Sequence, residues 1–208
     1  MKTDSTIATA GMALTVFGVF TVTSALAENA PPARIRGTVE SIDGQDLTVT
    51  SRDGSSVKIK LAPDYLVTAV VKADMTDVSV GKYVGIAALP QLANDAEKAL
   101  EVLVLPESAR GSGEGHYPWD LTPESMMTNA TIAAAVDQED GRALTLKYKD
   151  GENRIIVPKD VPIVTFTPGD RSLLAPGAGI LVSVVKQPDG TMTASRVVVG
   201  KDGVKPPM

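Results

Sequence analysis

The chain has 208 residues, a formal net charge of −5 and no cysteine. The absence of cysteine excludes disulfides, thiolate metal ligands and cysteine nucleophiles. The negative net charge gives no positive field to attract phosphate backbones or anionic lipid, so we expect no nucleic acid partner. Any metal site must use histidine, methionine, carboxylate or backbone oxygen.

The N-terminal segment has the layout of a secretory signal peptide. Residues 7–27 are mostly apolar, Ala25 and Ala27 match the small-residue cleavage pattern, and a proline pair just beyond would end any helix. We therefore expect a signal-peptide helix over residues 1–27, cleaved after Ala27, and a mature protein that is periplasmic or secreted and free of the membrane. Because the basic region before the apolar stretch is weak, an uncleaved membrane anchor or a buried helix is the alternative.

Two similar stretches follow, the first half over residues 34–106 and the second half over residues 129–200. Each contains short segments with apolar residues at every second position, which is the pattern of half-buried strands. In each half an Asp-Gly pair, Asp53-Gly54 or Asp150-Gly151, separates two such segments and favours a tight hairpin turn. The same order of features in both halves indicates an internal repeat.

Short strands with turn signals between them are typical of a barrel or a sandwich. We expect an all-β protein with two tandem small antiparallel β-barrels, OB-like or related, and one continuous sandwich as the alternative. The predicted parts are a signal peptide (1–27), one barrel (34–106), a connector (107–128), a second barrel (129–200) and a tail (201–208).

The opening segment Gly37-Thr-Val-Glu-Ser-Ile-Asp-Gly-Gln-Asp-Leu-Thr-Val49 and the closing segment Asp189-Gly-Thr-Met-Thr-Ala-Ser-Arg-Val-Val-Val-Gly200 carry a family resemblance. They resemble a widespread bacterial family of small exported β-barrel domains of unknown function. This resemblance covers both halves, implies a β-barrel fold and an extracytoplasmic location, and brings no catalytic residues. The whole chain is also similar to bacterial proteins labelled as metal-transporter permeases.

The connector holds the only histidine, the only tryptophan and two of the seven methionines. Its row of Tyr117, Trp119 and Leu121 would be costly to expose in a flexible tether. We therefore predict that the connector packs on one or both barrels as a clasp or binding segment, with Trp119 as its anchor.

A competing hypothesis makes the connector a site for copper(I) or a similar soft metal. His116 with Met126 and Met127 would supply ligands of the type that copper(I) prefers, and Glu114 or Asp120 would orient the imidazole. Neighbouring side chains point apart on a strand, so this site requires a turn or irregular backbone at the two methionines.

No sequence motif indicates catalysis. The chain lacks a G-x-S-x-G nucleophile, a P-loop, an H-E-x-x-H zinc motif and an EF-hand loop, so we expect no enzyme. The polar stretch at residues 94–98 is interpreted as a solvated loop or one helical turn. The predicted function is an exported, non-enzymatic binding or interaction module of the bacterial envelope, whose partner is an envelope protein or a metal ion. The alternative is a periplasmic copper-binding or metal-transport accessory protein that acts through the connector.

Overall fold

The computed structural model describes residues 33–91 and 95–206. The predicted signal peptide over residues 1–27 lies outside the described residues, as do the last two residues of the predicted tail. Within the described residues the regular elements are strands and three short 3₁₀ helices, so the prediction of an all-β fold is confirmed. No helix in this part of the chain is long and apolar enough to cross a membrane.

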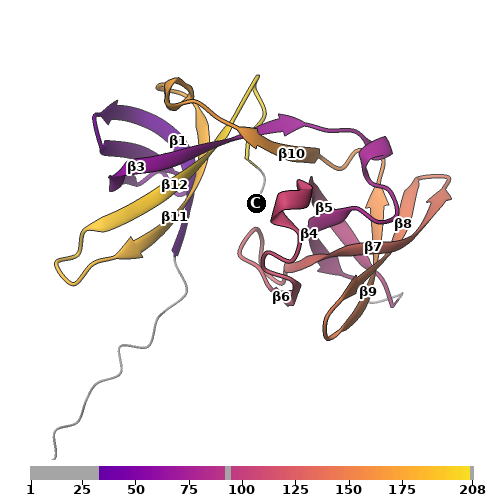
Figure 1. The fold of residues 1–208 in the computed structure, drawn as a ribbon. Helices are drawn as coiled ribbons and strands as arrows, with labels where there is room; N and C mark the ends of the chain where they lie inside the picture. The colour runs from indigo at the N-terminus through magenta and orange to yellow at the C-terminus, as the bar shows by residue number, and fades with distance from the viewer. Residues whose placement is uncertain (1–32, 92–94, 207–208) are drawn as a thin grey trace, which may run out of the picture. The chain divides into compact units, whose positions relative to one another are not determined.

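Five strands close into a ring of hydrogen-bonded neighbours, which we call the first barrel (Figure 1). They are β1 (Ala33–Asp43), β2 (Asp46–Ser51), β3 (Ser56–Lys72), β11 (Gly179–Lys186) and β12 (Met192–Gly200). The order around the ring is β1, β2, β3, β12, β11, and only the β3–β12 pair is parallel. Each strand contributes to one apolar core, through side chains such as Val39, Val49, Ile59, Val182 and Val197.

Five other strands form a second ring, the second barrel. They are β4 (Tyr83–Pro90), β5 (Glu97–Val104), β7 (Met126–Gln138), β8 (Gly141–Tyr148) and β9 (Gly151–Pro158). The order is β5, β4, β7, β8, β9, and a short parallel contact of Glu97 with Ile155 and Lys98 with Ile156 closes the ring. Its core includes Ile86, Val102, Ile132, Leu146 and Ile155.

The two barrels exchange strands between the halves of the chain. The first barrel takes β1, β2 and β3 from the first half and β11 and β12 from the second. The second barrel takes β7, β8 and β9 from the second half and β4 and β5 from the first. The prediction that residues 34–106 and 129–200 each form a barrel is therefore corrected: neither range contains all the strands of one ring. A period of two determines which face of a strand is buried, but not which strand lies beside it.

The chain passes between the rings along β3 and β10 (Ile163–Pro168). The end of β3 pairs antiparallel with β10, and β10 pairs in parallel with β5. Val70, Leu103 and Val164 form a small third apolar cluster at this crossing. The 3₁₀ helices are η1 (Met75–Asp77), η2 (Glu107–Ala109) and η3 (Arg171–Leu173).

The two predicted Asp-Gly turns differ in the structure. Gly54 lies in the turn between β2 and β3 and has a φ of 84°, a conformation that glycine adopts without strain. Gly151 is instead the first residue of β9 and lies opposite Tyr148, so the β8–β9 hairpin turns at Lys149 and Asp150. The dipeptide marked both hairpins, but its place in the turn differs between them.

Candidate binding site at the connector

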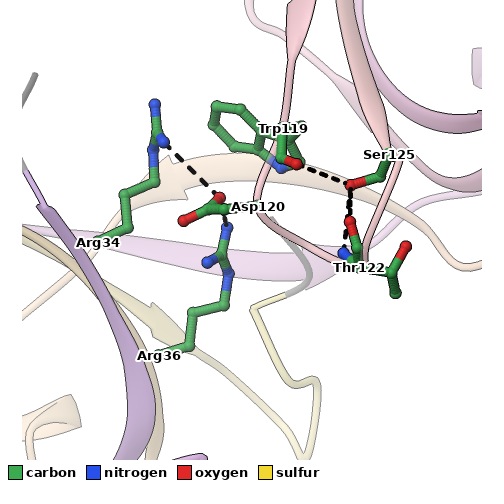
Figure 2. Close-up of polar contacts among 6 residues, drawn as sticks. All are labelled: Arg34, Arg36, Trp119, Asp120, Thr122 and Ser125. Atoms are coloured by element: carbon green, nitrogen blue, oxygen red, sulfur yellow. Dashed lines mark hydrogen bonds and ion pairs between the residues drawn. The ribbon is translucent and has the colours of Figure 1, made fainter.

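The connector contains a short strand and a closed loop. Strand β6 (Gly115–Pro118) pairs with β7, and residues 119–125 form a loop that returns to β7. The backbone N–H of Trp119 donates to the Ser125 carbonyl at 2.7 Å. The Ser125 hydroxyl, in a residue only 1% exposed, lies 3.0 Å from the Trp119 carbonyl and 2.7 Å from the Thr122 carbonyl (Figure 2). These bonds hold Trp119 at a defined place.

Trp119 contacts the first barrel through an arginine. The guanidinium carbon of Arg34, on β1, lies 3.9 Å from the centroid of the indole ring, which is the geometry of a cation–π interaction. Tyr117 packs edge-on against the same ring at 6.1 Å, and Leu121 is half-buried. The connector therefore pairs with β7 of the second barrel and also contacts β1 of the first, as a clasp would.

Asp120 forms an ion pair with the same strand. Its Oδ1 accepts a hydrogen bond from Arg36 Nη2 at 2.8 Å and lies 3.6 Å from Arg34 Nη1 (Figure 2). The hydrogen bond from Arg36 holds the pKa of Asp120 below its usual range, against the opposing effect of burial. The Arg36 side chain is only 7% exposed, so this carboxylate stabilises a buried cation. Asp120 thus serves the β1 arginines rather than His116, its predicted partner.

A second carboxyl group, Glu101 on β5, lies within the electrostatic reach of Arg36. Glu101 is 3% exposed, and its Oε1 has no hydrogen-bond partner. Burial raises its pKa to about 8, although Arg36 and Arg52 act in the opposite direction. The indole Nε1 of Trp119 is also buried without a hydrogen-bond partner. Unpaired buried polar atoms are unusual and point to a functional role or a strained region.

Arg36 also lines a pocket of about 440 Å³ on the first barrel. The walls come from β1, the end of β2, the segment leading into β11, and the tail after β12. The lining residues are Arg36, Gly37, Thr38, Thr50, Ser51, Arg52, Gly177, Ala178, Gly179, Ile180, Gly200, Gly203, Val204, Lys205 and Pro206. The pocket therefore lies beside a cation that the connector fixes in place.

His116 lies in a separate polar cluster on the second barrel. Its Nδ1 is 2.9 Å from Thr128 Oγ1, and its Nε2 is 3.5 Å from Glu97 Oε1. Asn153 Nδ2 donates to Glu97 Oε2 at 2.9 Å, and the imidazole stacks on the Tyr148 ring at 6.4 Å. The carboxylate beside His116 is therefore Glu97. In the stretch 94–98, interpreted as a solvated loop or helical turn, Glu97 and Lys98 are the first residues of β5, and Asn94 lies outside the described residues.

The predicted metal ligands do not converge on one point. Met126 and Met127 are consecutive residues of strand β7, so their side chains leave opposite faces of the sheet, and Met127 is 1% exposed. Glu114 is exposed in the loop before β6, while Asp120 is bound to arginines. Among the described residues, no three histidine, cysteine or acidic side chains form a cluster able to hold a metal ion.

No family model, curated protein or solved structure matches this chain. The family resemblance of the two halves therefore remains an expectation, and the site has to be interpreted from its own residues.

Sequence reasoning missed four charged residues of these sites, Arg34, Arg36, Glu97 and Glu101. One signal was available. Glu101 is a lone carboxylate inside the apolar segment Leu100-Glu-Val-Leu-Val-Leu105, where a charged residue is rare unless it is paired. The arginines of β1 carry no comparable signal, because alternating polar residues are ordinary on a half-buried strand.

Proposed function

We propose that this chain is a non-enzymatic binding or interaction module of the bacterial envelope. The observation that supports it is the pocket of about 440 Å³ on the first barrel, with the buried Arg36 in its wall. Burying a cation costs desolvation free energy that its partner, here Asp120, has to offset. Ligand pockets are typically concave, with a few fixed polar groups that orient the ligand.

We also infer that the two halves derive from one repeated unit of OB-like type. Corresponding hydrogen bonds support this: Gly81 N–H donates to Ile132 O at 2.9 Å, and Gly177 N–H donates to Val39 O at 2.8 Å. A further pair follows the same pattern. Ile132 N–H donates to Lys82 O at 2.9 Å, and Val39 N–H donates to Ala178 O at 2.9 Å.

A blocking substitution tests the binding role. Gly179 lies in the pocket wall, and a Cβ there would meet only ordinary contacts, the nearest being Pro206 Cδ at 3.4 Å. Gly179→Tyr should fill the pocket. The test is a screen of anionic, cationic and neutral small molecules. At least one of them should raise the melting temperature of the wild-type protein saturably and have no effect on the melting temperature of Gly179→Tyr. If no molecule distinguishes the two proteins, the pocket is not the binding site.

The expected envelope location has its own test. N-terminal sequencing of the protein recovered from a bacterial periplasm should begin at Glu28, directly after the predicted cleavage site. A protein that keeps its N-terminus and stays with the membrane would support the anchor alternative instead.

A metal-handling role is the second candidate function. It is favoured by the pair of His116 Nε2 and Glu97 Oε1 at 3.5 Å, since both side chains are mostly buried, at 26% and 12% exposure. Calorimetric titration with copper(I), copper(II) and zinc should show one-to-one binding that His116→Ala abolishes. Glu97→Gln should weaken the binding, because the Glu97 carboxylate lies beside the imidazole Nε2. No heat from any of the three ions would reject this role.

A further inference from the structure

We propose that the pocket beside Arg36 binds a small molecule through a multiply charged oxyanion group, a phosphate or a carboxylate. This inference rests on the proposed binding role and names the ligand chemistry of that site. Three observations carry it: the charge of the lining, the contrast with the second barrel, and the fixed position of Arg36.

The lining carries charge of one sign. Arg36, Arg52 and Lys205 contribute three cationic side chains, and no aspartate or glutamate is among the lining residues. Thr38, Thr50 and Ser51 add hydroxyl groups. The chain as a whole has a net charge of −5, so a wall of cations alone is a local departure from the overall composition. Guanidinium groups match the geometry of phosphate and carboxylate oxygens and bind them with paired hydrogen bonds.

The corresponding place on the second barrel is filled. Tyr83 lies opposite Thr131 at the start of β4, just as Gly179 lies opposite Thr38 at the start of β11. Tyr83 is 1% exposed, and its hydroxyl donates to the Ser112 carbonyl at 3.1 Å. At the matching position of the first barrel Gly179 has no side chain of its own. The tail residues Lys205 and Pro206 lie beside it, and the pocket remains between them and the strands.

Arg110 of the connector completes the filling on the second barrel. Its guanidinium donates to Thr131 Oγ1 at 2.9 Å and to the Gly81 carbonyl at 2.8 Å, and it lies over the Tyr83 ring at 5.7 Å. The corresponding residues of the first barrel are Thr38 and Gly177, and both line the pocket. On the second barrel Tyr83 and Arg110 thus fill this place, whereas on the first barrel a pocket remains beside the tail.

The charge at these two places differs as well. Asn129 lies opposite Gly85 on the second barrel, and Arg36 lies opposite Leu181 on the first. Asn129 is neutral, and its Nδ2 donates to the Gly113 carbonyl and to the Tyr117 hydroxyl. At matching strand positions the second barrel therefore has the neutral Asn129 and the first has the cationic Arg36. The cation at the filled place, Arg110, belongs to the connector and is paired with Glu107.

The structure fixes Arg36 before any ligand arrives. Asp120 holds its guanidinium at 2.8 Å, and the Arg36 carbonyl accepts the backbone N–H of Arg52 at 3.1 Å. A donor that is already positioned loses little conformational entropy when it binds an anion. The raised pKa of Glu101, about 8, keeps this neighbouring carboxyl mostly neutral at pH 7, so it competes weakly with an anion for Arg36 and Arg52.

Titration with inorganic pyrophosphate and with citrate tests the inference, and comparing the two separates phosphate from carboxylate recognition. We expect saturable binding of at least one anion at low ionic strength. Arg52→Gln and Lys205→Gln should each weaken it, by about tenfold for the loss of one charge-assisted contact. Gly179→Tyr should abolish it. Lys186→Gln removes a cation of the same barrel that does not line the pocket and should leave the affinity unchanged.

Two outcomes would overturn the inference: neither anion binds, or binding persists unchanged in Arg52→Gln, Lys205→Gln and Gly179→Tyr. Arg52 and Lys205 are exposed, so their variants are expected to fold even if Gly179→Tyr does not. A third outcome is that neither anion binds, but a molecule of another class stabilises the wild-type protein and not Gly179→Tyr. The anion inference then fails, while the binding role of the pocket stands. If nothing binds, the small-molecule binding role fails with it.

Discussion

Arg36 and Asp120 are 84 residues apart in the sequence and share a hydrogen bond of 2.8 Å. Arg36 belongs to β1 of the first barrel, and Asp120 belongs to the connector that pairs with the second barrel through β6. The connector, for which the sequence predicts a clasp and, as the competing hypothesis, a soft-metal site, is thus bound by charge to a strand of the first barrel.

Replacing Asp120 by asparagine should destabilise the protein. Arg36 is 7% exposed and would lose a charged hydrogen-bond partner, which costs about 1.5–3 kcal/mol of unfolding free energy. Urea unfolding followed by circular dichroism measures the change. Asp137→Asn is the matched control, because Asp137 also pairs with an arginine, Arg142, but is 77% exposed, so its loss should cost no more than about 1 kcal/mol. If the two substitutions lower the free energy of unfolding equally, burial of Arg36 does not strengthen its ion pair with Asp120.

Trp119→Ala should lower the free energy of unfolding by about 2–4 kcal/mol, because it removes a large ring and the cation–π contact with Arg34. Trp119→Phe keeps an aromatic ring and removes the unpartnered indole N–H, so it should cost much less. Trp119 is the only tryptophan, so unfolding must be followed by circular dichroism rather than fluorescence. Equal stability of wild type and Trp119→Ala would contradict the anchoring role.

Glu101 should make the protein less stable as the pH rises. Its pKa is raised by burial from 4.5 to about 8, so the folded state binds a proton that the unfolded state releases between these values. The stabilisation is present below about pH 4.5, is lost progressively up to about pH 8, and amounts to about 5 kcal/mol at most.

This prediction is tested by measuring the free energy of unfolding of wild type and Glu101→Gln at several pH values. The variant should lack this part of the pH dependence and become relatively more stable toward pH 8. Glu152→Gln, on an exposed position of β9, serves as the control. Parallel pH profiles for wild type and Glu101→Gln would mean that the pKa of Glu101 does not differ between the folded and unfolded states.

Cutting the connector should not separate the two halves. A protease site inserted into the exposed loop at residues 111–113 would leave β11 and β12 in a ring with β1, and β4 and β5 in a ring with β7. The two fragments should elute together in native size-exclusion chromatography and separate only in denaturant. Fragments that separate without denaturant would show that each half closes by itself.

Much of the strand content was predictable, because period-two alternation and turn residues are local signals. Leu47, Val49 and Ile59 lie in the first core as the alternation predicts, and both hairpins occur where Asp53-Gly54 and Asp150-Gly151 mark them. The choice of partner strands was not predictable in this way. The alternation of apolar and polar residues along β3 does not show whether its neighbour is β5, from the same half of the chain, or β12, from the other half.

The site was predictable only in part. The unusual composition of the connector correctly drew attention to Trp119, whose ring contacts the first barrel. Its partners Arg34 and Arg36, and Glu97 beside His116, come from distant strands, and nothing local in the sequence links them. A side-chain cluster that forms across strands depends on the pairing of those strands, so it could not be known before the topology.

The parallel pairing of β3 with β12 also sets an order of events during synthesis. All strands of the second barrel exist once residue 158 has been made, whereas the first barrel must wait for residues 192–200. Its earliest strand, β1, therefore stays without a complete ring through most of translation, and closing so long a loop is slow.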